Sequence, residues 1–297
     1  MQASAYLKLS VATAVVTIVL KTAAWWWTGS VSLAADALES LVNLAGAMFA
    51  LGMVTWAAQP PDAEHPYGHH KAEYFSSGFE GILIIAAALG ILWGAVDRWR
   101  HPEPLQSVGL GVALAIVSSA LNGALAWAML RKAREVRSIA LEGDARHLFT
   151  DVWTSAGVVV GLLGVMATGW QWLDPALAVM VALNILREGV HLMRESTRGL
   201  MDEALDADSQ ARVNDVLERF RHPEHVRFDH IVSRVAGQRR FIDLHMHMPA
   251  NWTLARAAAL RTEVEQALMA ALPGLRASIQ MLPMDVEAHF DDPKDLV

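Results

Sequence analysis

Apolar positions along the chain follow two patterns, which predict a membrane part and a soluble part. Six long apolar runs come before residue 205. An apolar helix of about 20 residues crosses the hydrocarbon core of a bilayer, which is about 30 Å thick. The sequence therefore predicts six membrane-spanning helices, at approximately residues 7–27, 33–56, 79–96, 108–130, 139–166 and 172–193.

Beyond residue 205 the spacing of apolar positions becomes that of a small soluble domain. Residues 241–248 alternate between apolar and polar side chains, which is the pattern of a half-buried strand. The remaining predicted elements are strands at 226–235 and 276–282, a turn at Gly237, and helices at 209–220 and 254–272. The order α-β-β-α-β is typical of a ferredoxin-like, two-layer α+β domain.

The predicted fold class is therefore an all-α membrane bundle of six helices followed by a C-terminal α+β domain. We expect a transmembrane domain over residues 1–204, a cytoplasmic α+β domain over residues 205–290, and an acidic, mobile tail over residues 291–297. The first apolar run is too long for a signal peptide and lacks a small-residue cleavage site, so we interpret it as the first span.

Composition supports a membrane protein and restricts its chemistry. The chain is 54% hydrophobic and 19% charged, with a mean hydropathy of +0.28, which is too apolar for an ordinary soluble domain. Cysteine is absent, so a metal site must use histidine, carboxylate, amide or water. The net charge of −7 and the lack of a long basic stretch argue against nucleic acid as a partner.

Loop charge predicts how the chain crosses the membrane. Basic residues concentrate between the fourth and fifth spans and after the sixth, and the opposite loops hold few beyond Arg98 and Arg100. By the positive-inside rule both termini lie in the cytoplasm. We therefore expect a multi-pass protein of the inner (cytoplasmic) membrane, surrounded by lipid.

Two pairs of polar residues interrupt the second and fifth spans. Glu39 and Asn43 are four residues apart, and so are His147 and Asp151. Side chains four apart lie on one face of a helix, and ionisable residues inside a membrane usually face a partner or a water-filled path. Two such helices side by side would form a four-ligand site at membrane depth. This arrangement predicts a protein that moves a divalent cation.

Other interpretations of these residues remain open at this stage. The four side chains could instead form a polar network that holds helices together. An intramembrane metal-dependent hydrolase could use His147 and Asp151 as ligands and Glu39 as base, although no His-Glu-x-x-His motif occurs. A passive metal channel or sensor would respond to metal independently of a proton gradient. Asp36 and Asp144 each lie three residues before a candidate ligand, where they could orient it or serve as cap or loop residues.

Several stretches together resemble one family. They are Thr28-Gly29-Ser30-Val31-Ser32, Asp36-Ala37-Leu38-Glu39-Ser40, His65-Pro66-Tyr67-Gly68-His69-His70-Lys71-Ala72-Glu73, His147-Leu148-Phe149-Thr150-Asp151 and Leu200-Met201-Asp202. Over about residues 6–287 the chain resembles the cation diffusion facilitators. The resemblance implies a homodimer, not an enzyme, that exports divalent transition metals driven by proton entry. It puts Zn²⁺ and Fe²⁺ first, with Mn²⁺, Co²⁺, Ni²⁺ and Cd²⁺ also possible.

The resemblance also implies three features of the site. The transport site of the family lies between the second and fifth spans, at positions that here hold Glu39, Asn43, His147 and Asp151. The cytoplasmic loop site of the family matches Asp62, His65 and His69, which could otherwise be a solvated polar loop. The charge lock at the membrane–cytosol junction matches Lys71 and Asp202. At the position of Glu39 the family often has Asp or His, and at the position of Asn43 it often has Asp. Both residues therefore depart from the usual zinc site of the family.

The cytoplasmic metal sites of the family match poorly. The aligned positions hold Asp229, His245, Ala258, Gln280 and Leu282. Only the first two are good ligands, so we do not expect a binuclear site and expect dimerisation with little dependence on metal. His247 and Asp243 share a strand face with His245, and with His230 nearby in the preceding strand they could rebuild a site. Asp229, His245 and His247 are its candidate ligands. The simpler expectation is that this face of the sheet is solvated or lies in an interface.

The predicted membrane ligands explain coupling to protons. Metal binding requires deprotonated carboxylates and a neutral imidazole, so metal and protons compete for the site. His147 can titrate near neutral pH, Glu39 and Asp151 balance the charge of the ion, and Asn43 offers a neutral carbonyl oxygen. Three oxygen ligands and one nitrogen admit both harder ions such as Mn²⁺ and borderline ions such as Zn²⁺ and Fe²⁺.

Overall fold

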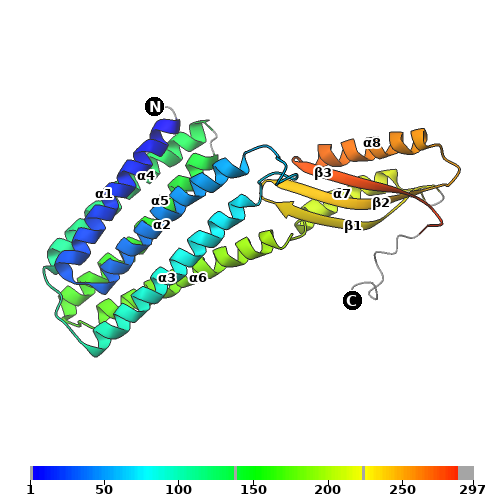
Figure 1. Cartoon of the computed structure of the whole chain (residues 1–297). Helices are drawn as coiled ribbons and strands as arrows, with labels where there is room; N and C mark the ends of the chain where they lie inside the picture. Colours follow the sequence, from blue (N-terminus) through cyan, green and yellow to red (C-terminus); the bar gives the residue numbers. More distant parts are fainter. Residues whose placement is uncertain (1–2, 137–138, 223–224, 287–297) are drawn as a thin grey trace. The chain divides into compact units, whose positions relative to one another are not determined.

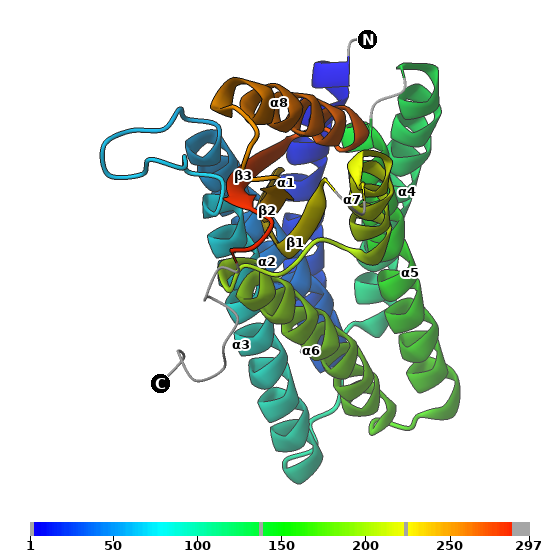
Figure 2. The same ribbon diagram turned by 90° about the vertical axis from the view of Figure 1, so that its right-hand side faces the viewer.

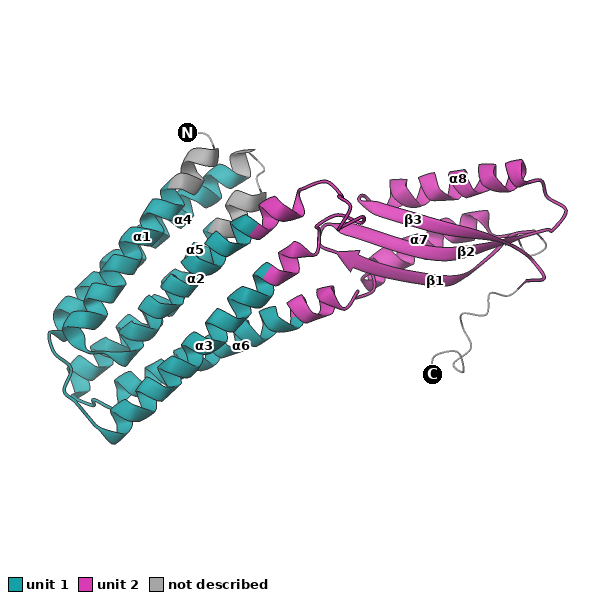
Figure 3. Ribbon diagram, in the orientation of Figure 1, with its two compact units in different colours: residues 1–52, 76–194 teal, residues 53–75, 195–297 magenta. Residues whose placement is uncertain are grey.

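The computed structural model describes the backbone of residues 3–136, 139–222 and 225–286, and the side chains of residues 9–133, 145–222 and 225–286. The chain forms two compact units (Figure 3). Unit 1 comprises residues 1–52 and 76–194, and unit 2 comprises residues 53–75 and 195–297. The tail expected over residues 291–297 and the side chain of Asp144 lie outside the described residues.

Six long helices account for the apolar part of the chain (Figure 1). They are α1 (Ala3–Thr28), α2 (Val31–Ala57), α3 (Ala72–Arg100), α4 (Val108–Val136), α5 (Ile139–Thr168) and α6 (Leu173–Leu200). Each contains a segment long and apolar enough to cross a membrane, so the six predicted spans are confirmed. Several helices extend beyond the predicted spans, because a helix can continue through polar residues after its apolar run has ended.

Small residues let neighbouring helices of unit 1 approach closely. α1 packs against α4, and α4 against α5. α3 and α6 run side by side (Figures 1 and 2) and meet at Gly81 and Gly189. A methyl group added at Gly81 would lie 3.0 Å from the carbonyl oxygen of Gly189, so the crossing depends on the missing side chains.

A buried carboxylate joins the beginnings of α2 and α6. Asp174, in the first turn of α6, is fully buried. Its Oδ2 accepts the backbone N–H of Val31 at 2.8 Å, and its Oδ1 accepts the hydroxyls of Ser30 at 2.5 Å and Ser32 at 2.6 Å. The first N–H groups of a helix have no partner within that helix, and a negative charge is favourable beside them. Asp174 therefore caps α2 from a different helix.

Unit 2 contains the α+β domain, and its elements occur in the predicted order. They are α7 (Ala207–Phe220), β1 (Arg227–Ala236), β2 (Arg239–Met248), α8 (Leu254–Ala271) and β3 (Leu275–Pro283). β2 is the central strand, antiparallel to β1 and parallel to β3. Side chains from both helices and all three strands form one apolar core, which includes Val216, Ile242, Val264 and Leu268. The predicted fold class is thus confirmed.

The central strand is more buried than its alternating sequence predicts. Every residue from Leu244 to Met248 is buried, and Asp243 is exposed. One reason is that His230 of β1 stacks on His245, with ring centroids 4.6 Å apart. His230 has a φ of +47° and follows Asp229 at an irregularity in the pairing of β1 with β2. His245 and His247 on this face of β2 are therefore covered, while Asp243 on the same face is exposed.

Candidate metal sites

The four predicted membrane ligands line one cavity in unit 1. Glu39 and Asn43 come from α2, and His147 and Asp151 come from α5, on the walls of a cavity of about 400 Å³. Nδ2 of Asn43 lies 3.4 Å from Nε2 of His147. Both pairs therefore line the same cavity, and the four-ligand site stays a prediction.

One oxygen in this cavity lacks a partner among the described residues. Oε2 of Glu39 is shielded from solvent and accepts no hydrogen bond there. A buried carboxylate oxygen without a donor is costly, unless a cation or a proton occupies the space beside it. The residues that line this cavity include carboxylates, an imidazole and an amide, which are side chains that bind divalent cations.

A buried ion pair lies next to this site. Nζ of Lys21 contacts Oδ1 of Asp36 at 2.8 Å, and both residues are 1% exposed. Asp36 also accepts the Ser155 hydroxyl at 2.8 and 3.0 Å, while Lys21 donates to the Ser40 hydroxyl at 2.8 Å. The network joins α1, α2 and α5, and Ser40 directly follows Glu39. Asp36 of α2 thus pairs with Lys21 of α1 and accepts a hydrogen bond from Ser155 of α5.

Sequence reasoning missed other polar residues on the walls of the same cavity. They are Glu80 on α3, Thr150 on α5, and Asn184 and Glu188 on α6. The signal was present, because Glu80 and Glu188 lie within apolar runs, where an ionisable residue is a functional candidate by default. Helical spacing alone does not show that α3 and α6 contribute to a site on α2 and α5.

The predicted loop residues meet in unit 2. Asp62 Oδ1 lies 3.2 Å from Nδ1 of His65, and Oδ2 lies 3.3 Å from Nε2 of His69. One ligand atom from each residue lies within 4.8 Å of the others, a separation that a single ion could bridge. The backbone N–H of His65, and then its imidazole, hold the pKa of the Asp62 carboxyl below its usual value. Asp62 is therefore ionised and ready to bind a cation at neutral pH.

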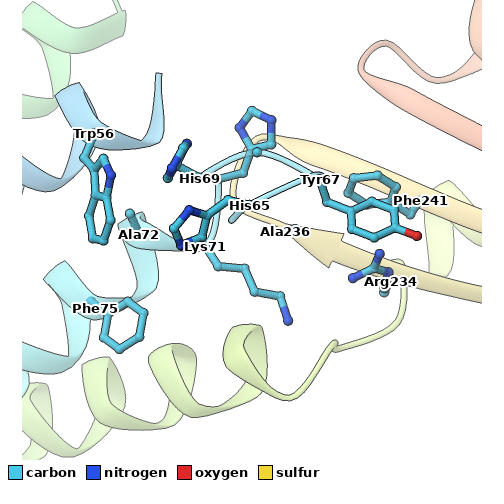
Figure 4. Close-up of a pocket in the computed structure, with 12 residues that line it drawn as sticks. Trp56, His65, Tyr67, His69, Lys71, Ala72, Phe75, Arg234, Ala236 and Phe241 are labelled. Atoms are coloured by element: carbon cyan, nitrogen blue, oxygen red, sulfur yellow. The ribbon is translucent and has the colours of Figure 1, made fainter. Parts of the chain in front are cut away.

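His69 is the buried member of this loop cluster. It is 6% exposed and packs against Trp56 at a ring-centroid distance of 5.6 Å (Figure 4). Its Nδ1 is shielded from solvent and has no hydrogen-bond partner in the described part of the chain. The neighbouring His70 lines the same pocket but does not belong to the three-residue cluster.

The predicted charge lock is present and has a third member. Nζ of Lys71 lies 3.0 Å from Oδ1 of Asp202, and Nη1 of Arg234 lies 3.2 Å from the same oxygen. Partial burial raises the pKa of Asp202, but the hydrogen bonds from Lys71 and Arg234 outweigh it, so its pKa is lowered overall. The side chains of Lys71 and Asp202 are 35% and 43% exposed, so the bridge adds little to stability.

A third cluster occupies the polar face of the sheet. Oδ1 of Asp229 lies 3.0 Å from Nε2 of His247 and 3.3 Å from Nδ1 of His245. The histidines are 6% (His245) and 1% (His247) exposed, so these two side chains are covered within the chain rather than solvated. The other ring nitrogen of His247 lies 3.2 Å from the carbonyl oxygen of Pro283, which can fix the ring so that Nε2 faces Asp229.

The rest of the family's cytoplasmic ligand set is absent from this face. Gln280 pairs with His245 across β2 and β3, and Leu282 pairs with His247. The aspartate and two histidines could therefore hold one ion, with Leu282 offering no ligand for a second.

Comparison with known proteins gives matches along nearly the whole chain. The profile for the cation efflux transmembrane domain matches residues 7–201, and the profile for the cation efflux protein cytoplasmic domain matches residues 205–284. The uncharacterized transporter sll1263 of Synechocystis sp. is 43% identical over 290 residues, which cover 98% of this chain and 93% of that protein. The cation-efflux pump FieF of Yersinia pestis is 32% identical over 287 residues, covering 94% of each. FieF of Klebsiella pneumoniae is 30% identical over 270 residues, covering 91% of this chain and 89% of that protein.

Among solved structures, similar chains cover less than a third of this chain. The zinc form of the putative zinc transporter CzrB is 28% identical, with a TM-score of 0.27, covering 29% of this chain and 98% of that chain. The metal-bound C-terminal domain of the CzcD transporter from Thermotoga maritima is 18% identical, with a TM-score of 0.25, covering 27% of this chain and 93% of that chain.

Proposed function

The chain belongs to the cation efflux family of multi-pass membrane metal transporters, which are not enzymes, and we propose that it is a proton-coupled antiporter. It exports divalent transition-metal cations from the cytoplasm, with Zn²⁺ and Fe²⁺ the first candidates. The observation that carries this proposal is the cavity that Glu39, Asn43, His147 and Asp151 line together, with a shielded oxygen on Glu39 that has no partner among the described residues.

The ligand set accounts for exchange of metal against protons. A divalent ion needs Glu39 and Asp151 ionised and the His147 ring neutral, so each bound ion displaces protons. When the cavity opens to the proton-rich side, protons displace the ion. When it opens to the cytoplasm, metal displaces the protons. An inward proton gradient therefore drives metal outward.

The departures from the family's ligands bear on which metal is carried. Asn43 contributes no charge, and turning its amide oxygen toward the ion would give a set of three oxygens and one nitrogen. Oxygen ligands suit harder ions such as Mn²⁺, whereas imidazole suits Zn²⁺ and Fe²⁺. We therefore keep Zn²⁺ and Fe²⁺ first, and include Mn²⁺, Co²⁺, Ni²⁺ and Cd²⁺ among the ions to be tested.

Proteoliposomes with and without an imposed pH gradient test this function. Purified protein is reconstituted around a metal-sensitive dye, and uptake is measured for each of the six ions. Flux should require the gradient and should be lost in His147→Ala. Trp153→Phe is the matched control, because Trp153 lies on the same helix, is 77% exposed and does not line the cavity. Equal flux without a gradient would identify a passive channel, and normal flux in His147→Ala would refute the site.

The same proposal extends to assembly and orientation. The cytoplasmic domain matches that of cation efflux proteins, and we propose that it joins two copies of the chain as a homodimer. We propose that the protein lies in the inner membrane. The basic loop residues favour an orientation in which both termini are in the cytoplasm. The loop cluster of Asp62, His65 and His69 would bind metal on the cytoplasmic side.

The burial of His245 and His247 favours one metal ion in the cytoplasmic domain over a bare sheet face. Two buried histidines that share one carboxylate oxygen form a compact N₂O set. Metal bound per chain, measured by equilibrium dialysis with Zn²⁺, should fall by one ion in His247→Ala. An unchanged stoichiometry would show that the cluster is a hydrogen-bonded pair of histidines and nothing more.

A further inference from the structure

Two additional carboxylates reach the transport cavity from helices that carry none of the four predicted ligands. Glu80 lies on α3 and Glu188 on α6, and both line the cavity that contains Glu39, His147 and Asp151. They lie close enough for Glu80 to interact electrostatically with His147 and with Glu188. The cavity wall thus carries two more carboxyl groups than the α2–α5 residues supply.

The close crossing of α3 and α6 places these two side chains together. Each glutamate directly precedes one of the two glycines at the crossing, Gly81 and Gly189. A methyl group at Gly189 would meet Ile84 and Ile85 at 2.8 and 2.9 Å and the carbonyl oxygen of Gly81 at 3.1 Å, so no larger residue fits without a shift. The backbones therefore fix the positions from which both carboxylates enter the cavity.

A third glycine makes room for the Glu80 carboxyl group against α2. A methyl group added at Gly46 would lie 2.9 Å from Cγ and Cδ of Glu80 and 3.1 Å from its Oε1. Gly46 is three residues after Asn43, so the two positions lie on one face of α2. Glu80 thus brings an oxygen to the helix face where Asn43 supplies an amide instead of a carboxylate.

No salt bridge or hydrogen bond accounts for Glu80 among the described side chains. It is half-buried at membrane depth, where an unpaired ionised carboxylate is costly. Glu39, whose Oε2 is shielded from solvent and has no hydrogen-bond partner among the described residues, lines the same cavity. Both features are explained if a cation occupies the space between α2, α3 and α5.

We propose that Glu80 is a further ligand of the transported ion and supplies the negative charge that Asn43 does not. This inference rests on the proposed function and changes its ligand set to three carboxylates, one imidazole and one amide. Such a set favours harder divalent ions more than the α2–α5 residues alone would. Glu188, one turn from Asn184 on α6, increases the negative potential beside Glu80.

Binding of Co²⁺, followed by its visible absorption, tests the proposal on purified full-length protein. The background carries Asp62→Ala and Asp229→Ala, so that the loop and sheet clusters do not obscure the cavity. Glu80→Gln should weaken Co²⁺ binding by about tenfold or more and change the spectrum of what remains bound. Asp97→Asn is the matched control, because it removes a carboxylate from an exposed position of the same helix.

Two further variants separate a ligand from a packing residue. Adding Asn43→Asp to Glu80→Gln should restore Co²⁺ affinity to within about threefold, because it returns the missing charge to the adjacent helix face. Gly46→Ala should weaken binding with Glu80 intact, since the methyl group displaces the carboxyl group. Glu80→Asp keeps the charge and can replace Glu80→Gln if that variant does not fold.

The outcomes distinguish this inference from the proposed function. Unchanged affinity in Glu80→Gln, with binding lost in His147→Ala, would overturn the role of Glu80 and leave the transport site standing. If Glu80→Gln weakens Co²⁺ binding and Asn43→Asp does not restore it, the claim that Glu80 supplies the charge that Asn43 lacks would be overturned. Unchanged affinity in His147→Ala would instead refute the transport site.

Discussion

Replacing Lys21 with methionine should destabilise unit 1 strongly, although the residue lies outside the predicted ligand set. Methionine fills a similar volume but leaves the Asp36 carboxylate buried without its counter-charge. At an effective dielectric constant of about 20, two unit charges at the observed 2.8 Å attract by about 6 kcal/mol. Removing one partner of a buried pair typically costs about 3–5 kcal/mol.

The structure places the expected cost at the lower end of that range. In Lys21→Met, Asp36 keeps the hydrogen bond that the Ser155 hydroxyl donates to its carboxylate, which offsets part of the lost interaction. We therefore expect a loss of about 3 kcal/mol in the free energy of unfolding, which for a unit of this size lowers Tm by about 6–12 °C. Tryptophan fluorescence of the detergent-solubilised protein on heating measures this change.

A double variant separates charge from packing in this network. Lys21→Met with Asp36→Leu removes both charges, and such replacements of buried ion pairs are often close to neutral. The double variant should therefore be more stable than Lys21→Met alone. The pair does not hold α1, α2 and α5 together by charge if Lys21→Met melts within about 1 °C of the wild type. The same conclusion follows if the double variant melts at a lower temperature than Lys21→Met.

Three other expectations concern selectivity, the charge lock and assembly. Asn43→Asp should strengthen Zn²⁺ binding about tenfold by calorimetry, because it adds a charge to the cavity, and equal affinities for every ion would exclude Asn43 as a ligand. Lys71→Ala should slow transport while changing stability by less than about 1 kcal/mol, because the bridge is half exposed. The pKa of Asp202 is lowered in the folded protein, so any stability from this bridge is present above about pH 4 and is lost as pH falls below that, which melting curves from pH 3 to 7 can check. The homodimer should survive chelators, as measured by light scattering of the full chain in detergent, and dissociation into monomers would show that metal in the cytoplasmic domain holds the two copies together.

The sequence predicts the elements of this fold well, because each has a strong local signal. Six apolar runs of spanning length predict six helices, and the strand alternation around Leu244 predicts the central strand. Spacing of four residues also places Glu39 with Asn43, and His147 with Asp151, on single helix faces. These features depend only on periodicity along one element.

Features that depend on contacts between elements were not predictable in the same way. Glu80 reaches the cavity because Gly81 and Gly189 let α3 and α6 cross closely, and because Gly46 leaves room for its carboxyl group against α2. Burial of the polar face of β2 depends on His230 of the neighbouring strand, so alternation predicted a solvated face. Arg234 joins the charge lock from β1, and it is distant in sequence from Lys71 and Asp202, the two residues that the family resemblance identified. Each case is a convergence of segments distant in sequence, which a period within one segment does not encode.

The cap that Asp174 forms on α2 restricts how the cavity can open. Because a buried carboxylate ties the beginnings of α2 and α6 together, these two helices cannot separate evenly along their lengths. Glu188 lies 14 residues after Asp174, about 21 Å along the helix axis. A tilt of α6 by about 10° around the capped end would therefore move Glu188 by nearly 4 Å while leaving the cap intact. A small angular change of α6 therefore suffices to move Glu188 relative to the other residues that line the cavity.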